Sequence, residues 1–173
     1  MPPQFVAFRT ATADDVPAIR SLVRQAYARW VPAIGREPRP MLVDYAEAIR
    51  DFRFDLLTID GRLAGLLQTC PCADHLWIEN LAVHPHHQRR GHGQSLLVLA
   101  EQLARHAGLD RLRLLTNAAF AGNIALFEKA GYTVEQREPF LGGTTLYMTR
   151  SLAPSFPIRA AHGWRDRTAP TAW

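Results

Sequence analysis

The sequence predicts an α/β fold, because strand and helix patterns alternate along most of its length. An apolar segment at 76–83 leads through a glycine turn into a helical pattern at 96–107 and a further strand pattern at 111–116. This order is typical of a β-α-β unit. In addition, Asp60-Gly61 lies between two strand patterns and predicts a tight hairpin. A chain of 173 residues, 47% hydrophobic, can bury the core of one such domain.

The first third of the chain predicts one short strand and two helices. Residues 5–9 alternate as a strand, and Thr12 or Asp14 can cap the helix that follows. Apolar residues recur in this helix at the spacing of one helical face: Val16, Ile19, Leu22, Val23, Ala26, Tyr27 and Trp30. A loop rich in proline follows over 31–40, and a second helix is expected over 42–50.

The remainder of the chain predicts six strands and two helices. Strands at 56–59 and 63–69 flank the Asp60-Gly61 turn, and the third helix ends at Gly108. After the strand at 111–116, a short helix over 122–130 ends at Gly131 and precedes strands at 132–137 and 144–149. The pattern dissolves beyond this point, so we expect one domain over 1–152 and an extended tail over 153–173.

Composition and charge narrow the range of partners. The chain carries 20 Lys+Arg against 16 Asp+Glu, a net charge of +4, but has no block of basic residues, so no nucleic-acid partner is expected. No apolar run approaches the ~18 residues of a membrane span. The N-terminus lacks the features of a secretory signal, and these observations predict a cytoplasmic protein.

Cysteines and histidines raise the question of a metal site. Cys70 and Cys72 form only half of a zinc site. Four histidines gather in a predicted turn, where a rigid and convergent ligand set is not expected: His84, His86, His87 and His92. We therefore expect solvated loop histidines and no metal.

The segment Gln88 to Ser95 has the features of a phosphate-binding turn. Gly91 and Gly93 lack a Cβ, so that backbone N–H groups can point outward, and the following helix adds the partial positive charge of its N-terminus. Arg89 and Arg90 add full charges. A dinucleotide-binding Gly-x-Gly-x-x-Gly is not matched, because Leu96 occupies the third glycine position, and a Gly-Lys-Ser/Thr loop is absent.

Two flanking motifs give this turn a family context. Leu81-Ala82-Val83-His84-Pro85 precedes it, and Asn123-Ile124-Ala125-Leu126-Phe127-Glu128-Lys129-Ala130-Gly131-Tyr132 lies downstream. Together they resemble the GNAT family of acyl-CoA-dependent N-acetyltransferases over about 5–152. The resemblance implies a mixed, mostly antiparallel central sheet of six or seven strands flanked by about four helices. It also implies acetyl-CoA as acyl donor and a small-molecule or peptide amine as acceptor.

The resemblance further implies where the cofactor would bind. Its pyrophosphate would contact the backbone of 89–95, and its pantetheine would lie beside the strand at Leu81 to Val83. Asn123, read as the cap of the short helix, would contact the cofactor or serve only as a cap, and Phe127 would pack near the thioester. The implied cofactor residues are Leu81, Ala82, Val83, Gln88, Arg89, Arg90, Gly91, His92, Gly93, Gln94, Ser95, Asn123 and Phe127.

Amine acetylation requires a proton acceptor, and Glu79 is the only acidic residue in the strand at 76–83. We expect it to act as general base through water; the alternative is a carboxylate engaged in an ion pair. Many family members have tyrosine at the position of Phe127, whose ring cannot protonate the leaving thiolate. Tyr132 is nearby in sequence but is expected to be a core aromatic residue.

Aromatic residues outside these motifs are candidates for the acceptor pocket: Tyr27, Trp30, Tyr45 and Tyr147. Each of them could equally serve packing. Two functions therefore remain open. One is an N-acetyltransferase acting on a primary amine, and the other is an acyl-CoA-binding regulatory or partner-binding module with little turnover. Either reading allows a homodimer.

Overall fold

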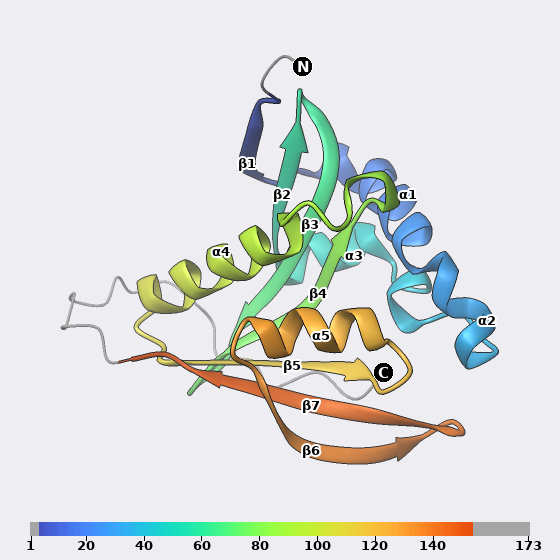
Figure 1. The fold of residues 1–173 in the computed structure, drawn as a ribbon. Helices are drawn as coiled ribbons and strands as arrows, with labels where there is room; N and C mark the ends of the chain where they lie inside the picture. The colour runs from blue at the N-terminus through green and yellow to red at the C-terminus, as the bar shows by residue number, and fades with distance from the viewer. Residues whose placement is uncertain (1–3, 154–173) are drawn as a thin grey trace. The chain divides into compact units, whose positions relative to one another are not determined.

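The computed structural model describes residues 4–153, and its elements are drawn in Figure 1. The strands are β1 (Val6–Thr10), β2 (Arg53–Ile59), β3 (Arg62–Pro71), β4 (Leu76–Val83), β5 (Arg111–Asn117), β6 (Thr133–Phe140) and β7 (Gly143–Ser151). The α-helices are α1 (Val16–Tyr27), α2 (Val31–Ile34), α3 (Tyr45–Asp51), α4 (His92–His106) and α5 (Ala121–Lys129). Short 3-10 turns are η1 (Ala13–Asp15), η2 (Ala28–Trp30), η3 (Arg39–Met41) and η4 (Pro85–His87).

The strands form a seven-stranded sheet in the order β1-β2-β3-β4-β5-β7-β6. β1 pairs antiparallel with β2, and β7 pairs antiparallel with both β5 and β6. β4 and β5 pair parallel, as the β-α-β pattern around α4 requires. The predicted α/β fold with a mixed sheet is therefore confirmed.

The chain divides into two compact units. Unit 1 comprises residues 1–68 and 80–96, and unit 2 comprises 69–79 and 97–173. Both β3 and β4 therefore contribute residues to each unit. The predicted tail, apart from its first residue, lies outside the described residues.

Unit 1 has a core between α1 and the strands. Ile19 and Val23 on the inner face of α1 are fully buried, as are Leu56 and Leu57 of β2. The chain enters η1, which leads directly into α1, through a capping box in which the Thr12 N–H donates to the Asp15 carboxylate at 2.8 Å. The predicted hairpin is confirmed: β2 ends at Ile59 and β3 begins at Arg62. Asp60 and Gly61 between them both have positive φ, +50° and +77°.

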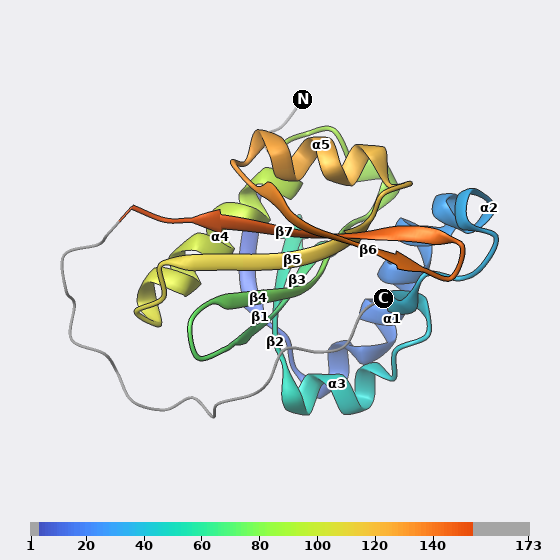
Figure 2. The same cartoon turned by 90° about the horizontal axis from the view of Figure 1, so that it is seen from below.

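Unit 2 is built around β5, β7 and β6, with α5 beside them (Figure 2). Leu112 and Leu114 of β5 and Met148 of β7 are almost fully buried. The β4–β5 ladder comprises three residue pairs, from Leu76↔Leu112 to Ile78↔Leu114. The long ladders of unit 2 are thus those on both sides of β7.

Element boundaries differ from expectation in the segment between α1 and β2. The region 31–40, predicted as a loop, contains α2 and η3. Pro32 lies in the first turn of α2, where its missing N–H has no intrahelical acceptor in any case, and Gly35 ends that helix at φ +70°. The second predicted helix begins at Tyr45 rather than 42. The reason is that the Asp44 carboxylate accepts the Ala46 N–H at 2.9 Å and fixes the start there.

The start of α4 also differs, and this difference bears on the site. Helix formation begins at His92, not at Leu96, so that residues 92–95 of the turn predicted over 88–95 are the first turn of a 15-residue helix. The Ser95 N–H donates to the Gly91 carbonyl at 3.0 Å and closes that turn.

Candidate cofactor and catalytic site

The N-terminus of α4 presents an anion-binding geometry in unit 1. Helix geometry leaves the N–H groups of His92, Gly93 and Gln94 without intrahelical acceptors. Gly91 immediately before them has φ +86°, a conformation that L side chains rarely adopt, and open space surrounds the position where a Cβ would lie. A group with phosphate oxygens therefore has unobstructed access to backbone donors at the positive end of a helix dipole.

The loop before α4 is held by one amide. Gln88 donates through Nε2 to the Val83 carbonyl at 2.9 Å, and its Oε1 accepts from Arg29 of η2 at 3.2 Å. Both ends of the amide are therefore engaged within the protein. Gln88, predicted to bind the cofactor, acts in this structure as a brace that joins the end of β4 to the turn after α1.

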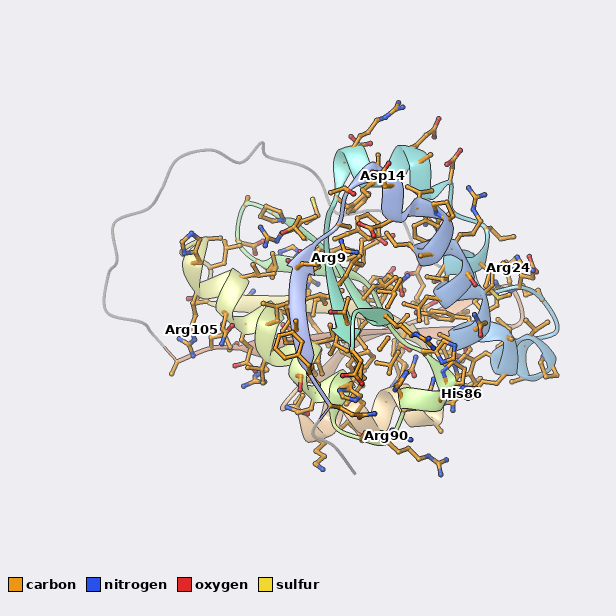
Figure 3. The ribbon with its side chains drawn as sticks, turned by 90° about the horizontal axis from the view of Figure 1, so that it is seen from above. Arg9, Asp14, Arg24, His86, Arg90 and Arg105 are labelled. Carbon is orange, nitrogen blue, oxygen red and sulfur yellow. The ribbon has the colours of Figure 1, made fainter. Side chains whose placement is uncertain are left out.

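Arg89 and Arg90 are both exposed, and Figure 3 shows Arg90 and His86 on the segment between β4 and α4. Arg89 has φ +60°, one of three positive φ values at non-glycine residues in the part of the chain that the structure describes. The predicted charges thus lie within a few residues of the free N–H groups and are accessible to an anion.

The four histidines of this region form a chain of ring contacts. The rings of His84 and His86 lie 5.1 Å apart, those of His84 and His87 5.8 Å, and those of His87 and His92 6.3 Å. Burial, followed by the charges of neighbouring cations, lowers the pKa of both His84 and His87. His84 accepts the His86 N–H at Nδ1, and its Nε2 lies 3.0 Å from the Gln25 amide oxygen. These contacts suit a neutral imidazole protonated at Nε2.

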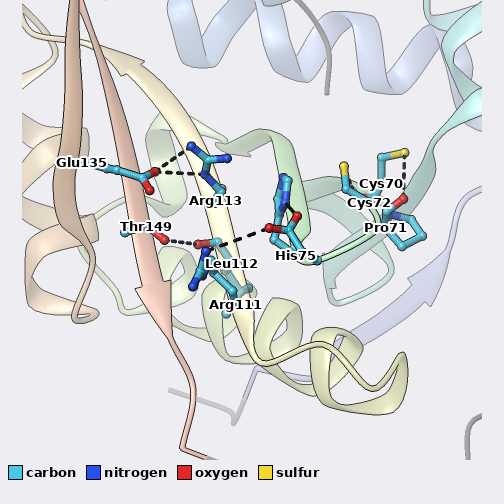
Figure 4. A network of polar contacts seen from close by, with 10 residues as sticks. Cys70, Pro71, Cys72, His75, Arg111, Leu112, Arg113, Glu135 and Thr149 are labelled. Carbon is cyan, nitrogen blue, oxygen red and sulfur yellow. Dashed lines mark hydrogen bonds and ion pairs between the residues drawn. The ribbon is translucent and has the colours of Figure 1, made fainter. Parts of the chain in front are cut away.

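No group of three or more His, Cys, Asp or Glu side chains within residues 4–153 is arranged to hold a metal ion. Figure 4 shows the two cysteines near the end of β3 and His75 just before β4. The Cys72 thiol lies 4.0 Å from the Cys70 carbonyl oxygen. Likewise, none of the helices in this range is long and apolar enough to cross a membrane.

Glu79 lies on β4 in unit 2 and is half-buried. Its Oε2 accepts the indole N–H of Trp77 at 2.7 Å. Trp77 was not among the residues predicted from the sequence. Its position two residues before Glu79 was an available signal, since residues i and i+2 of a strand share one face. The other strand residues predicted beside the cofactor are half-buried at Leu81 and buried at Ala82 and Val83.

Asn123 does not cap α5. The helix begins at Ala121 after Phe120, which lacks a capping side chain, and Asn123 is the third residue of the helix with its N–H donating to the Phe120 carbonyl at 2.9 Å. The prediction of an N-cap at Asn123 was therefore wrong. Its half-buried amide lies in the first helical turn and is available for a role other than capping.

Phe127 is buried in unit 2, with its ring 5.9 Å from that of Tyr132. The Tyr132 hydroxyl is buried and has no hydrogen-bond partner, and burial raises its pKa well above the usual value. The charges of Arg150 and Glu101, which form an ion pair, also act on it. Tyr132 is therefore a core aromatic, as predicted.

Two of the four residues predicted for the acceptor pocket belong to a buried hydrogen-bond network. The Tyr27 hydroxyl donates to Asn80 Oδ1 at 2.8 Å, and Asn80 Nδ2 donates to the Tyr45 hydroxyl at 3.3 Å. The Tyr45 hydroxyl in turn donates to the Pro40 carbonyl at 2.7 Å. Tyr45 is 1% exposed. These contacts favour the packing alternative for both tyrosines over contact with an acceptor.

The other two predicted acceptor residues are half-buried. Trp30 is in unit 1, with the Arg29 guanidinium 4.2 Å from the centre of its ring. Tyr147 is on β7 in unit 2, where its hydroxyl donates to Glu138 at 2.9 Å. Burial, followed by this hydrogen bond, raises the pKa of Tyr147. Both remain candidates for acceptor binding.

Comparison with known families and proteins gives this site a chemical context. The model of the acetyltransferase (GNAT) family matches residues 17–132. A mycothiol acetyltransferase from Kineococcus radiotolerans is 40% identical over 77 residues, which are 43% of this chain and 24% of that protein. This chain thus matches about a quarter of that relative's length.

Solved structures share the fold. An acetyltransferase of the same family from Desulfovibrio desulfuricans has a TM-score of 0.72 at 22% identity, covering 86% of this chain and 100% of its own. The PaiA N-acetyltransferase of Thermoplasma acidophilum, solved in complex with coenzyme A, has a TM-score of 0.72 at 17% identity and covers 85% and 99%. The ribosomal-protein-S18-alanine N-acetyltransferase of Escherichia coli has 0.71 at 22% and covers 88% and 97%.

Proposed function

The chain belongs to the acetyltransferase (GNAT) family, and from that premise we propose that it transfers an acetyl group from acetyl-CoA to a primary amine. The observation that carries the proposal is the start of α4. Gly91 at φ +86° opens onto free space directly before a helix N-terminus. That geometry fits the pyrophosphate of coenzyme A, because the backbone can approach phosphate oxygens without a side chain in between.

In this proposal, each group of residues has its own task toward the cofactor. The backbone N–H groups of 91–94 and the side chains of Arg89 and Arg90 bind the pyrophosphate, with Gln88 holding their loop in place. Ser95, predicted to bind it too, instead donates its N–H to the Gly91 carbonyl. The strand from Leu81 to Val83 provides backbone groups for the pantetheine amides. From unit 2, Asn123 contributes its amide and Phe127 an apolar surface near the thioester.

Acetyl-CoA supplies an activated acyl group. The amine nitrogen attacks the thioester carbonyl, the new C–N bond forms and the C–S bond breaks. Glu79 accepts the amine proton through a water molecule, and a backbone N–H near Leu81 or Val83 donates to the developing oxyanion. The thiolate leaves without protonation by a tyrosine, because Phe127 has no hydroxyl that could donate a proton to the sulfur.

A second function, binding of acyl-CoA with little turnover, is favoured by one specific observation. Phe127 is buried against the ring of Tyr132 and has no hydroxyl, so it cannot itself give a proton to the sulfur. A regulatory or partner-binding module would need the backbone N–H groups at the start of α4 to bind acyl-CoA, but it would need no residue that protonates the leaving thiolate. The two functions therefore differ in turnover, not in cofactor affinity.

We propose that the acceptor is an amine on a small molecule or a peptide, and that either Trp30 of unit 1 or Tyr147 of unit 2 contacts it. The named similar proteins include both kinds, a mycothiol acetyltransferase and a ribosomal-protein alanine N-acetyltransferase. We also propose a single catalytic domain over 1–152, a cytoplasmic setting and a homodimer as the assembly to test.

The deciding experiment measures acetyl-CoA binding by calorimetry and thiol release with a panel of amines on the same preparation. The panel contains amino acids, amino sugars, polyamines and peptides with free N-termini. Binding with turnover of at least one class supports the transferase. Binding without turnover of any class supports the second function, and the absence of binding contradicts both.

A further inference from the structure

One side chain of β4 fixes the carboxylate proposed as general base. Trp77 and Glu79 alternate along the strand and share a face. The Trp77 Nε1–H donates to Glu79 Oε2 at 2.7 Å, a short hydrogen bond to a group that carries charge when deprotonated. Trp77 is 3% exposed, while Glu79 is half-buried. The indole thus approaches the carboxylate from the protein interior.

Trp77 is itself held by the residues that precede it. The His75 ring meets the Trp77 ring edge-on, with centroids 6.2 Å apart and planes at 76°. His75 is buried, and its Nδ1 lies 2.6 Å from the Asp74 carboxylate. Arg111 of β5 is 4.0 Å from the same carboxylate (Figure 4). The indole therefore has a fixed orientation before any substrate arrives.

We propose that Trp77 is a positioning residue for Glu79, an inference that rests on the proposed function. A hydrogen bond to the ionised form favours that form, so the indole N–H keeps the carboxylate deprotonated and ready to accept a proton. It also restricts the rotation of the carboxylate, so that Glu79 faces the amine in one orientation. Trp77 does not touch the reacting atoms; it acts through Glu79.

The hydrogen bond can be observed without turnover. In ¹H–¹⁵N NMR spectra, Trp77→Phe identifies the Trp77 indole resonance by its loss. In the wild-type protein this resonance should shift with pH. His75→Phe, which removes the titratable ring packed against Trp77, should keep a shift that Glu79→Gln abolishes in the same background. An indole shift in His75→Phe that is independent of pH, or one that persists when Glu79→Gln is added, would overturn the inference.

The effect on catalysis is measured by the pH profile of kcat/KM. Trp77→Phe and a variant with 3-benzothienylalanine at 77, which keeps the bicyclic shape without the N–H, should both move the acid limb to higher pH by about one unit. The isosteric variant separates the hydrogen bond from packing. A folded isosteric variant with the wild-type acid limb would contradict the positioning role.

Glu79→Gln distinguishes failure of this inference from failure of the proposed function. If Glu79→Gln keeps the wild-type rate while the indole resonance titrates, the contact is real but Glu79 is not the base, and the positioning role falls with it. If Glu79→Gln loses activity while the isosteric variant is unaffected, the proposed base stands and Trp77 is only a packing residue. A double variant of both sites should be no slower than Glu79→Gln alone.

Discussion

The Tyr27 hydroxyl donates a 2.8 Å hydrogen bond to Asn80 Oδ1 and thereby links α1 to β4 within unit 1. Both residues are buried, at 8% and 4% exposed. Asn80 also donates to Tyr45, so a single amide satisfies two aromatic residues from two helices. Asn80 directly follows Glu79 in the chain, so this network stabilises the strand that carries the proposed base.

Tyr27→Phe should lower the free energy of unfolding by about 1–3 kcal/mol, because Asn80 Oδ1 would lose its donor in a buried place. Urea denaturation measures the change. Tyr132→Phe is the matched control, since its buried hydroxyl has no hydrogen-bond partner and its removal should leave stability equal or higher. Unchanged stability of Tyr27→Phe with a raised KM for the amine would instead assign Tyr27 to the acceptor site.

Gly91→Val should weaken acetyl-CoA binding at least tenfold, about 1.4 kcal/mol, because the new side chain would occupy the approach of the pyrophosphate. Gly108→Val is the control: Gly108 also has positive φ and open space, but it lies at the other end of α4. Calorimetric titration of both variants with acetyl-CoA separates the effect of backbone strain from the loss of the phosphate-binding site at the start of α4. Equal affinities for the two folded variants would place the cofactor elsewhere.

Glu79→Gln should reduce kcat/KM by ~10²-fold and flatten the acid limb of its pH profile, because the amide keeps the shape but accepts no proton. Glu47→Gln makes the same chemical change at an exposed position on α3 and should leave the rate unchanged. Steady-state kinetics across pH checks both. A wild-type profile for Glu79→Gln would assign the base to another group.

Phe127→Tyr tests whether the missing acid limits turnover. A hydroxyl near the departing sulfur should raise kcat by up to ~10²-fold. Phe127 is buried beside Tyr132, so a hydroxyl that finds no partner there would cost about 1–3 kcal/mol of stability and bring no rate. Acetyl transfer and melting temperature are measured on one preparation. A destabilised variant without a gain in rate would show that the ring serves packing.

Stability should fall at acidic pH in a manner that depends on His84. Its pKa is lowered in the folded protein, so the unfolded chain takes up the proton first as pH falls. The contribution of His84 is therefore complete above its unfolded pKa of about 6.5 and is lost as pH falls through the lower folded value. Denaturation from pH 8 to 5 should show a shallower loss for His84→Gln, and identical slopes would contradict this prediction.

The sequence predicts the strands and helices well, because these depend on local patterns. Asp60-Gly61 predicts the hairpin correctly, since such a turn needs only two residues that tolerate positive φ. The start of α4 is less well predicted: the helix begins at His92, directly after Gly91, and not at Leu96. Asn123 shows the limit of such reasoning. Residue type favours asparagine as a cap, but α5 begins at Ala121, two residues before Asn123, and its N-cap position is Phe120, whose side chain cannot cap.

Contacts between distant residues could not be predicted from local patterns. Tyr27 was a reasonable choice for a pocket wall, since its spacing shows that it is on the apolar face of α1 but not which group meets its hydroxyl. That group, Asn80, is 53 positions away. The hydrogen bond from Trp77 to Glu79 is local by contrast. Strand alternation would have been enough to place the two residues on one face, although Trp77 was not among the residues predicted from the sequence.

Arg89 in the loop before α4 has φ +60°, a backbone conformation that residues other than glycine rarely adopt. A residue with a Cβ in this conformation costs on the order of 1–2 kcal/mol, which glycine would avoid. Arg89→Gly should therefore make a more stable protein that has lost a guanidinium beside the helix N-terminus. In the proposed function, this strained position exchanges thermal stability for affinity toward the pyrophosphate.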